Sequence, residues 1–286
     1  MYRMNQWRDG YELYELVDDS TNSWFRIAPE RGGLVVSLGL AGEELLYLDK
    51  DTFLNPDTNV RGGIPVLFPI CGQLQGGAYE WQGTTYFMKN HGVARTNPWT
   101  VLNVDTKDGA AITLQLVSNE RTLAEFPFEF ELVFEYVLKG GSLTIFQTYI
   151  NKSNRPMPMY AGFHPYFKSS VKDLHYDTDA TRYLDYNDMA EKDYEGHIDL
   201  TNMVESAVLL NASRRSISFP LPDIGRKVLM EYGPEFKYVV LWTVSGKPFV
   251  CVEPWMAKTG SLNTGQDVMY VKPGVPLKTY LTIRCM

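Results

Sequence analysis

The feature that most constrains this chain is strict two-residue alternation over residues 128–138. Large apolar side chains occupy every second position, and three of the five positions between them are glutamate. Successive side chains of a β-strand point to opposite faces, so one face of this segment belongs in a core and the other faces water. Gly140 and Gly141 follow, and residues 143–150 are again rich in apolar side chains, which predicts a hairpin.

The same kind of signal recurs along most of the chain. We expect further strands at residues 24–28, 33–40, 44–48, 111–117, 239–244, 248–252 and 277–284. Helix signals are weak, with residues 184–190 the best of them, and the polar segment 168–200 is interpreted as a long connection. Many strands with glycine-marked turns and very little helix predict an all-β protein, one large antiparallel β-sandwich forming a single domain over residues 1–286.

Composition excludes several classes of function. The net charge is −7 and no run of lysine or arginine stands out, so we expect no nucleic-acid partner. The cysteines and the four histidines have no close ligand-type spacing, which argues against disulfides, a bound metal or a cofactor; the cysteines are Cys71, Cys251 and Cys285. No segment resembles a signal peptide or a membrane span. We therefore expect a soluble cytoplasmic protein that is a monomer or a weak homodimer.

Two short runs place an ionisable residue directly before a proline and among aromatics. They are FHPYF around His164 and CVEPW around Glu253. A proline disfavours the helical region for the residue before it, so both side chains are expected on extended backbone. Imidazole and carboxylate together are a common pair for moving protons near neutral pH. Strand alternation also predicts that Glu253 faces away from Val250 and Val252 if these two valines point into the core.

Two further runs combine glycine with cationic or imidazole side chains. RGGIP begins at Arg61, and HGVAR runs from His91 to Arg95. The glycines allow backbone or ligand to approach closely, and a guanidinium can donate two hydrogen bonds to vicinal hydroxyls or to a phosphate. Neutral imidazole can donate to a sugar oxygen or accept from a hydroxyl.

In this order, the four runs resemble the aldose 1-epimerase (mutarotase) family, most closely its hexose-6-phosphate 1-epimerase branch. The resemblance implies a galactose mutarotase-like β-sandwich that holds its sugar in a cleft. It also implies His164 as general acid and Glu253 as general base, with Arg61, His91 and Arg95 as substrate-binding residues. The expected partner is a small-molecule sugar or sugar phosphate.

That chemistry suits the residue types. Interconversion of α and β anomers removes a proton from the C1 hydroxyl and protonates the ring oxygen, after which the ring opens and recloses on the other face. Each positioned proton donor or acceptor contributes about 10²–10⁴ in rate. No metal or nucleotide is needed.

Several alternatives stay open from the sequence. The same fold could serve a non-catalytic carbohydrate-binding or regulatory protein, whereas a glycoside hydrolase would need a second motif carboxylate. The resemblance also implies a further acidic residue, between the histidine and the glutamate, that binds sugar hydroxyls; Asp199, Glu205 and Asp223 all lie in that interval. The resemblance leaves phosphorylated and free sugars both possible as substrate.

Overall fold

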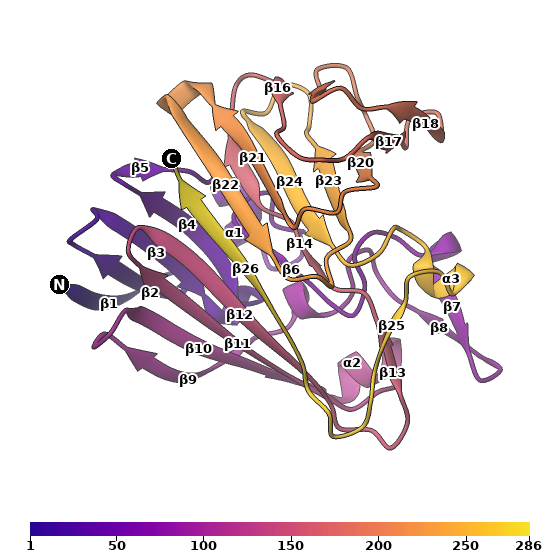
Figure 1. Ribbon diagram of the computed structural model, residues 1–286. Helices are drawn as coiled ribbons and strands as arrows, with labels where there is room; N and C mark the ends of the chain where they lie inside the picture. Colours follow the sequence, from indigo (N-terminus) through magenta and orange to yellow (C-terminus); the bar gives the residue numbers. More distant parts are fainter.

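The computed structural model describes residues 1–286 and is built almost entirely from antiparallel sheets (Figure 1). A five-stranded sheet takes up the start of the chain, in the order β1 (Tyr2–Asp9), β2 (Tyr11–Asp18), β3 (Ser23–Ala28), β4 (Leu34–Leu40) and β5 (Glu43–Glu44). A seven-stranded sheet has the order β21 (Ser216–Leu221), β22 (Arg226–Tyr232), β26 (Leu277–Cys285), β12 (Ser142–Asn151), β11 (Phe130–Lys139), β10 (Ala110–Val117) and β9 (Thr100–Asp105).

The third large sheet has eight strands, most of them short. Its order is β18 (Ala190–Asp193), β17 (Arg182–Asp185), β20 (Ala207–Leu210), β23 (Tyr238–Trp242), β24 (Phe249–Trp255), β14 (Gly162–Phe163) and β6 (Val66–Leu67), with β15 (Tyr166–Lys168) also paired to β24. Three two-stranded ribbons complete the β-structure: β13 (Met157–Met159) with β25 (Met269–Val271), β16 (Asp173–His175) with β19 (His197–Asp199), and β7 (Ala78–Trp81) with β8 (Thr84–Phe87).

Helix is scarce. The α-helices are α1 (Lys50–Leu54), α2 (Glu120–Glu125) and α3 (Ser261–Thr264), and single 3₁₀ turns occur at Pro29–Arg31, Gln75–Gly77, Ala94–Thr96 and Pro222–Ile224. The prediction of a large antiparallel sandwich with very little helix is confirmed. No helix of the structure has the length and apolar character that crossing a membrane requires.

The core differs between the sheets. Strand β11 alternates between buried and more exposed residues, as the 128–138 pattern predicts, whereas β24 is buried at every position. One cluster of 69 buried residues draws on all three large sheets, with Phe25, Phe134 and Val250 as examples. The strand that carries Glu253 is therefore covered on both faces.

Two sequence-based expectations for residues 168–200 are wrong. Residues 184–190 form no helix, because they run through the end of β17 and the turn into β18. The carboxylate of Asp185 accepts hydrogen bonds from the backbone and side-chain amides of Asn187, at 2.8 and 2.7 Å, and this local turn competes with helix formation. The supposed long connection contains four short strands, β16 to β19.

Other boundaries shift less. The expected strand at 44–48 shortens to β5, and Leu46 and Leu48 continue as isolated bridges to Phe167 and Gly62. The hairpin of β1 and β2 was not anticipated from sequence; its turn lies at Gly10, whose φ is 74°.

A buried arginine orders the segment that leads to Arg61. The Arg31 guanidinium donates to the backbone carbonyls of Thr52, Phe53, Asn55 and Thr58, at 3.2, 3.1, 2.7 and 2.8 Å. These carbonyls lie at the end of α1 and just after it, where helical hydrogen bonds are missing. The Arg61 amide then donates to the Thr52 hydroxyl at 3.0 Å. We call residues 31, 52–58 and 61 the Arg31 clamp.

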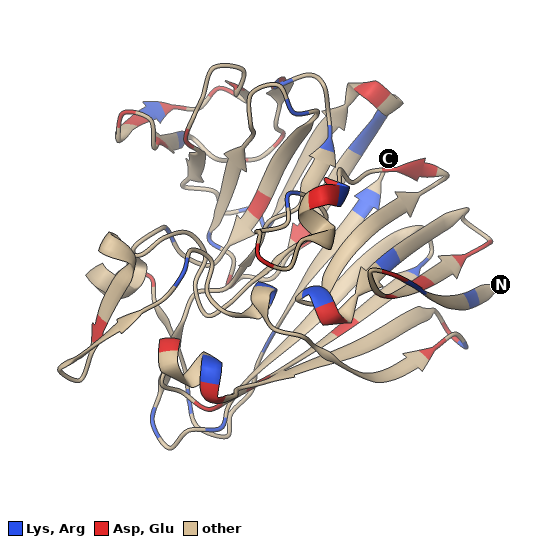
Figure 2. Cartoon of the chain, turned by 180° about the vertical axis from the view of Figure 1, so that it is seen from behind, with Lys and Arg blue, Asp and Glu red and all other residues tan.

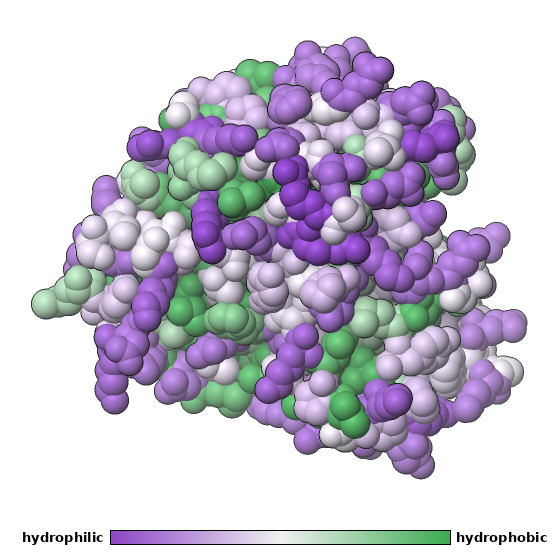
Figure 3. Space-filling view, viewed as in Figure 1, coloured by the Kyte–Doolittle hydropathy of each residue, from purple (hydrophilic) through white to green (hydrophobic).

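Charge and polarity are spread over the surface. Basic and acidic residues are interspersed along strands and loops (Figure 2). Mostly hydrophilic residues cover the region where β16, β17 and β18 lie (Figure 3). This polar region belongs to the segment that also supplies one side of the pocket described next.

Candidate active site

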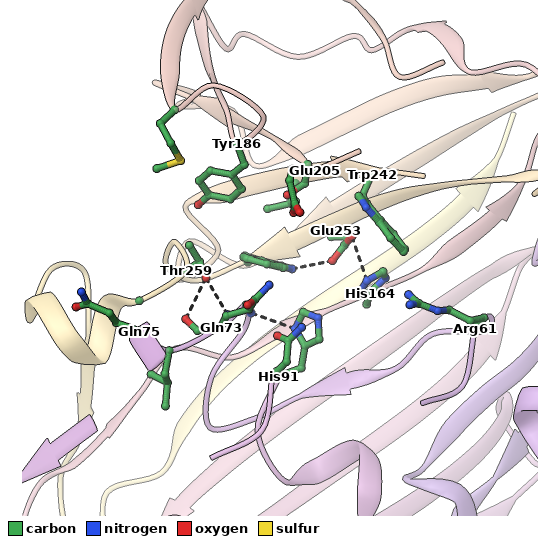
Figure 4. A pocket seen from close by; sticks show the side chains of 18 residues that line it. Arg61, Gln73, Gln75, His91, His164, Tyr186, Glu205, Trp242, Glu253 and Thr259 are labelled. Atoms are coloured by element: carbon green, nitrogen blue, oxygen red, sulfur yellow. Dashed lines mark hydrogen bonds and ion pairs between the residues drawn. The ribbon is translucent and has the colours of Figure 1, made fainter. Parts of the chain in front are cut away.

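A pocket of about 500 Å³ opens beside β23 and β24 of the eight-stranded sheet. His164 and Glu253, far apart in sequence, both line it (Figure 4). His164 Nε2 lies 3.4 Å from Glu253 Oε1. The two groups are in contact, so no ligand fits between them, and both are reached from the pocket side.

Backbone pairing explains how Glu253 reaches the pocket. It lies on β24 opposite Val240 of β23, and Trp255, two residues later, pairs with Gly162 of β14. Val250 and Val252 belong to the main core, while Glu253 lines the pocket, as strand alternation requires; Trp255 lines the pocket and also packs against the core. The indole of Trp255 donates to Glu253 Oε2 at 3.1 Å and leaves Oε1 directed to His164.

His164 lies between β14 and β15, and its amide donates to the Pro65 carbonyl at 3.1 Å. Its ring stacks on Tyr166 with centroids 4.6 Å apart and meets the edge of Trp242 at 5.6 Å. Only 7% of the residue is exposed. The imidazole is thus held by aromatic side chains with its Nε2 edge toward the carboxylate.

His91 has a left-handed backbone, with φ of 66°, which is rare for a residue with a side chain. Two reciprocal hydrogen bonds hold it: the His91 amide donates to the Gly72 carbonyl at 2.9 Å, and the Gly72 amide donates to His91 Nδ1 at 3.0 Å. Because Nδ1 accepts, a neutral ring carries its proton on Nε2. Gly92 follows with φ of 72°, and a Cβ there would lie 2.3 Å from the Phe68 carbonyl oxygen, so glycine is required.

The two arginines differ in placement. Arg61 lines the pocket, with its guanidinium carbon 5.1 Å from the centre of the Trp242 ring. Arg95 is not among the lining residues; it donates to the Asn90 carbonyl at 2.6 Å, and its Nε is buried without a partner. The structure therefore brings Arg61, His91, His164 and Glu253 to one pocket and sets Arg95 behind its wall.

Burial sets the electrostatics of the pocket. It raises the pKa of Glu253 well above the usual carboxyl value, against the hydrogen bond from Trp255 and the charge of Arg95. Burial, reinforced by Arg95, lowers the pKa of His164 to about 3. It also lowers the pKa of His91 well below the ordinary imidazole value. Burial therefore favours uncharged imidazoles and a protonated Glu253 carboxyl over a charged imidazolium–carboxylate pair.

Among the three acidic residues left open by the sequence, Glu205 lines the pocket. Asn187, in the β17–β18 turn, accepts hydrogen bonds from the Val204 and Glu205 amides at 3.0 and 2.9 Å and so positions this segment. In Figure 4 Glu205 lies between Tyr186 and Trp242. Asp199 instead accepts from the Thr201 amide at 2.8 Å, and Asp223 from Ser170 at 2.6 Å.

Sequence reasoning missed much of the pocket's polar lining. Gln73 and Gln75 come from the loop after Cys71, and Thr259 accepts from the Gln73 amide at 2.8 Å. Tyr186 and Met189 come from the segment expected to be helical. The glycines around Gln73 and Gln75 were a usable signal for a loop close to a ligand, but nothing local marked Tyr186 or Met189.

Comparisons with known proteins identify the family of this chain. Protein LacX (chromosomal) of Lactococcus lactis is 26% identical over 251 residues, covering 77% of this chain and 83% of that protein. A candidate glucose-6-phosphate 1-epimerase of Escherichia coli is 32% identical over 108 residues, 37% of this chain and 34% of that protein.

Among solved structures, the Slr1438 protein of Synechocystis sp. PCC 6803 superposes with a TM-score of 0.93 at 36% identity, covering 100% of this chain and 99% of that one. A galactose mutarotase-like protein from Lactobacillus casei has a TM-score of 0.76 at 22% identity, covering 99% and 100% of the two chains, which supports the fold. The family model for aldose 1-epimerase matches residues 25–271. This chain therefore belongs to the aldose 1-epimerase family of isomerases.

Proposed function

We propose that the protein interconverts the α and β anomers of an aldose or hexose 6-phosphate, with His164 as general acid and Glu253 as general base. The observation that carries the proposal is the 3.4 Å contact between His164 Nε2 and Glu253 Oε1 at the wall of the pocket. The C1 hydroxyl and the ring oxygen of a pyranose are bonded to the same carbon. Two adjacent groups on one wall can therefore serve both oxygens without standing on opposite sides of the ring.

A single proton shared by His164 and Glu253 fits a catalytic cycle in which the two residues exchange the roles of acid and base. Ring opening with His164 as acid and Glu253 as base moves one proton from the imidazolium to the ring oxygen and one from the C1 hydroxyl to the carboxylate. The opened state then has neutral imidazole and protonated carboxyl, the arrangement that burial also favours in the free site. Before each opening the proton therefore has to pass from the Glu253 carboxyl to His164 Nε2 across their 3.4 Å contact. In reclosure the carboxyl donates to the aldehyde oxygen and the imidazole accepts from the C5 hydroxyl.

His91 supports the same reaction as a hydrogen-bond donor. Its Nδ1 already accepts from Gly72, and its low pKa keeps the ring neutral, so Nε2–H is the proton available on the ring. The ring meets His164 edge-on with centroids 5.4 Å apart. A donor at this position can bind a sugar oxygen without competing for the proton of the pair.

Arg61 and Glu205 would recognise the rest of the sugar. The guanidinium of Arg61 can donate to hydroxyls or to a phosphate, whereas the carboxylate of Glu205 can accept from hydroxyls and repels a phosphate placed near it. A 6-phosphate would therefore lie on the Arg61 side of the pocket. Arg95 acts on the charges of His91 and His164 from behind the wall.

The test is polarimetry or NMR exchange on freshly dissolved α-anomer, with glucose, galactose and glucose 6-phosphate, compared with the spontaneous rate. We expect acceleration for at least one of these sugars. Binding of a sugar without acceleration of its anomer exchange would replace this proposal by a non-catalytic carbohydrate-binding role.

A further inference from the structure

A third potential ligand atom lies beside the His164–Glu253 pair. Cys251 Sγ, a nitrogen of His164 and a carboxylate oxygen of Glu253 all lie within 4.8 Å of one another. All three residues are buried, at 0%, 7% and 1% exposure. Cys251 is two residues before Glu253 on β24 and so points to the same face of the sheet.

Neighbouring strands hold the thiol in place. Cys251 pairs with Tyr166 of β15 on one side and with Trp242 of β23 on the other. Tyr166 stacks on the His164 ring, and Trp242 lines the pocket. The thiol is therefore buried beside residues that line the pocket, in a row of side chains whose backbone is fixed by sheet hydrogen bonds.

We propose that Cys251, His164 and Glu253 form a binding site for a zinc-class divalent ion, with a fourth position open to the pocket. Thiolate sulfur, imidazole nitrogen and carboxylate oxygen are the ligands that Zn²⁺ prefers, and sites with three protein ligands keep one position for water or another molecule. Occupancy would take both members of the acid–base pair and so block turnover. The blocking rests on the function proposed above, whereas the binding does not.

One of the ligand distances already fits a zinc ion, and the thiol is within reach of a small movement. Zinc bonds of about 2.0–2.3 Å in tetrahedral geometry place ligand atoms about 3.4–3.6 Å apart. The His164 Nε2 to Glu253 Oε1 separation of 3.4 Å already meets this requirement. The three ligand atoms lie no more than 4.8 Å from one another. A side-chain movement of about 1 Å therefore brings the Cys251 sulfur to the distance that a zinc ion requires.

Charge balance explains why a divalent ion suits the site. A thiolate and a carboxylate ligand together carry two negative charges, which neutralise the ion in a buried setting, and an imidazole adds a neutral ligand. Trp255 donates to Glu253 Oε2 and so orients the carboxylate as an outer partner of a metal ligand would. The nearby guanidinium of Arg95 opposes the ion, which predicts binding weaker than in a closed structural zinc site.

The test uses the full-length chain stripped with a chelator and titrated with Co²⁺ and then Zn²⁺. We expect one Co²⁺ per chain, a thiolate-to-cobalt absorption band in the near ultraviolet, and displacement of the band by Zn²⁺. Cys251→Ala should abolish the band and weaken Zn²⁺ binding, measured by calorimetry, at least about tenfold. Cys71→Ser and Cys285→Ser are matched controls, because the Cys71 thiol donates to the Ala257 carbonyl and Cys285 is in β26.

Retention of the band in Cys251→Ala, its loss in Cys285→Ser or Cys71→Ser, or the absence of any saturable binding would each overturn the proposal. If Cys251→Ala fails to fold by circular dichroism, Cys251→Ser keeps the side-chain size, and loss of the thiolate band is still expected. Because these readouts need no substrate, a chain that binds cobalt normally but has no epimerase activity would refute only the proposed function.

Discussion

The pocket has two regions of different character. The inner wall, which we define as His91, His164, Glu253 and Trp255, is at most 7% exposed. The rim, which we define as Gln75, Tyr186, Met189 and Glu205, is half-buried or exposed, and Met189 reaches 67% exposure. Burial changes the proton affinity of the inner wall, while the exposed residues Gln75 and Glu205 of the rim offer amide and carboxylate groups in contact with water. Under the proposed function, this difference separates chemistry from recognition within one cavity.

The largest effect should follow from Glu253→Gln. Removing the proton acceptor is expected to lower turnover about 10²–10⁴-fold while the pocket keeps its shape. Anomer exchange followed by polarimetry measures this loss. Wild-type turnover in the variant would break the distinction between the inner wall and the rim, because the buried carboxylate of the inner wall would then have no chemical role.

The same variant should be more stable than the wild type at neutral pH. The folded-state pKa of Glu253 is raised, so its contribution to stability is present below the ordinary carboxyl value and is lost as pH rises toward the folded value. Thermal unfolding should therefore show a Tm advantage for Glu253→Gln that grows between pH 4 and pH 8. An advantage that shrinks over this range would contradict the assignment of the proton to the carboxyl.

Activity should survive at pH 5, where an ordinary imidazole is largely protonated. The active form has one proton on the pair, so the acid limb reports protonation of His164, whose pKa is lowered to about 3, and the alkaline limb reports ionisation of Glu253. With the ordinary pKa values of a carboxyl and an imidazole, the acid limb would instead report Glu253 and the alkaline limb His164. An imidazole with pKa of about 6.5 would leave about thirtyfold less of the neutral ring at pH 5. Because the two groups interact, the pKa read from each limb is an apparent value of the pair and not of one residue.

The pH profile of kcat/KM tests this expectation in the absence of metal. A steep loss of activity centred near pH 6.5 would show that water reaches the inner wall. The contrast between the two regions would then be smaller than their exposure indicates.

Arg61→Gln should separate phosphorylated from free sugars. Loss of a charge-assisted hydrogen bond is expected to raise KM for glucose 6-phosphate about tenfold and to change KM for glucose far less. Arg8→Gln, which removes an exposed cation of β1, is the control for a simple change in net charge. If Arg61→Gln raised KM equally for both sugars, Arg61 would not recognise a phosphate and the substrate would be a neutral aldose.

The smallest effect should come from the rim. Glu205→Gln is expected to raise KM about fivefold with kcat unchanged, because the lost hydroxyl contact is made equally in ground and transition states. Asp199→Asn and Asp223→Asn are matched controls outside the pocket and should leave KM unchanged. A fall in kcat for Glu205→Gln would move this residue from recognition to chemistry.

Sequence predicted the regular sheet better than the sheet that carries the pocket. Strands β10, β11 and β12 follow alternation because one face meets the core and the other meets water. Strand β24 is buried throughout, so its role depended on the Glu-Pro-Trp run and the resemblance to a family. The segment around β17 and β18 was mistaken for helix, since Asp185 and Asn187 form a turn that apolar periodicity does not reveal.

The site residues divide in a similar way. Arg61, His91, His164 and Glu253 stand in recognisable runs, and the structure brings all four to the pocket. Arg95 stands in an equally clear run, yet its guanidinium donates to the Asn90 carbonyl. The direction of this side chain depends on the folded backbone and cannot be read from the motif. The sequence could not show which of Glu205, Asp199 and Asp223 faces the pocket. Asp223 is held outside it by the amide of Ser170, from a distant segment, and Asp199 by the amide of Thr201 in a local turn.

The Arg31 clamp has a consequence for the thermodynamics of ligand binding. Four carbonyls held by one guanidinium keep the chain between α1 and Arg61 ordered before any sugar arrives. Ordering this backbone costs about 1–2 kcal/mol of conformational entropy per residue. Because the cost arises during folding, it does not reduce the affinity for a ligand. Arg61 enters the encounter already preorganised, so ligand capture on this side of the pocket should proceed with little entropic penalty from the protein.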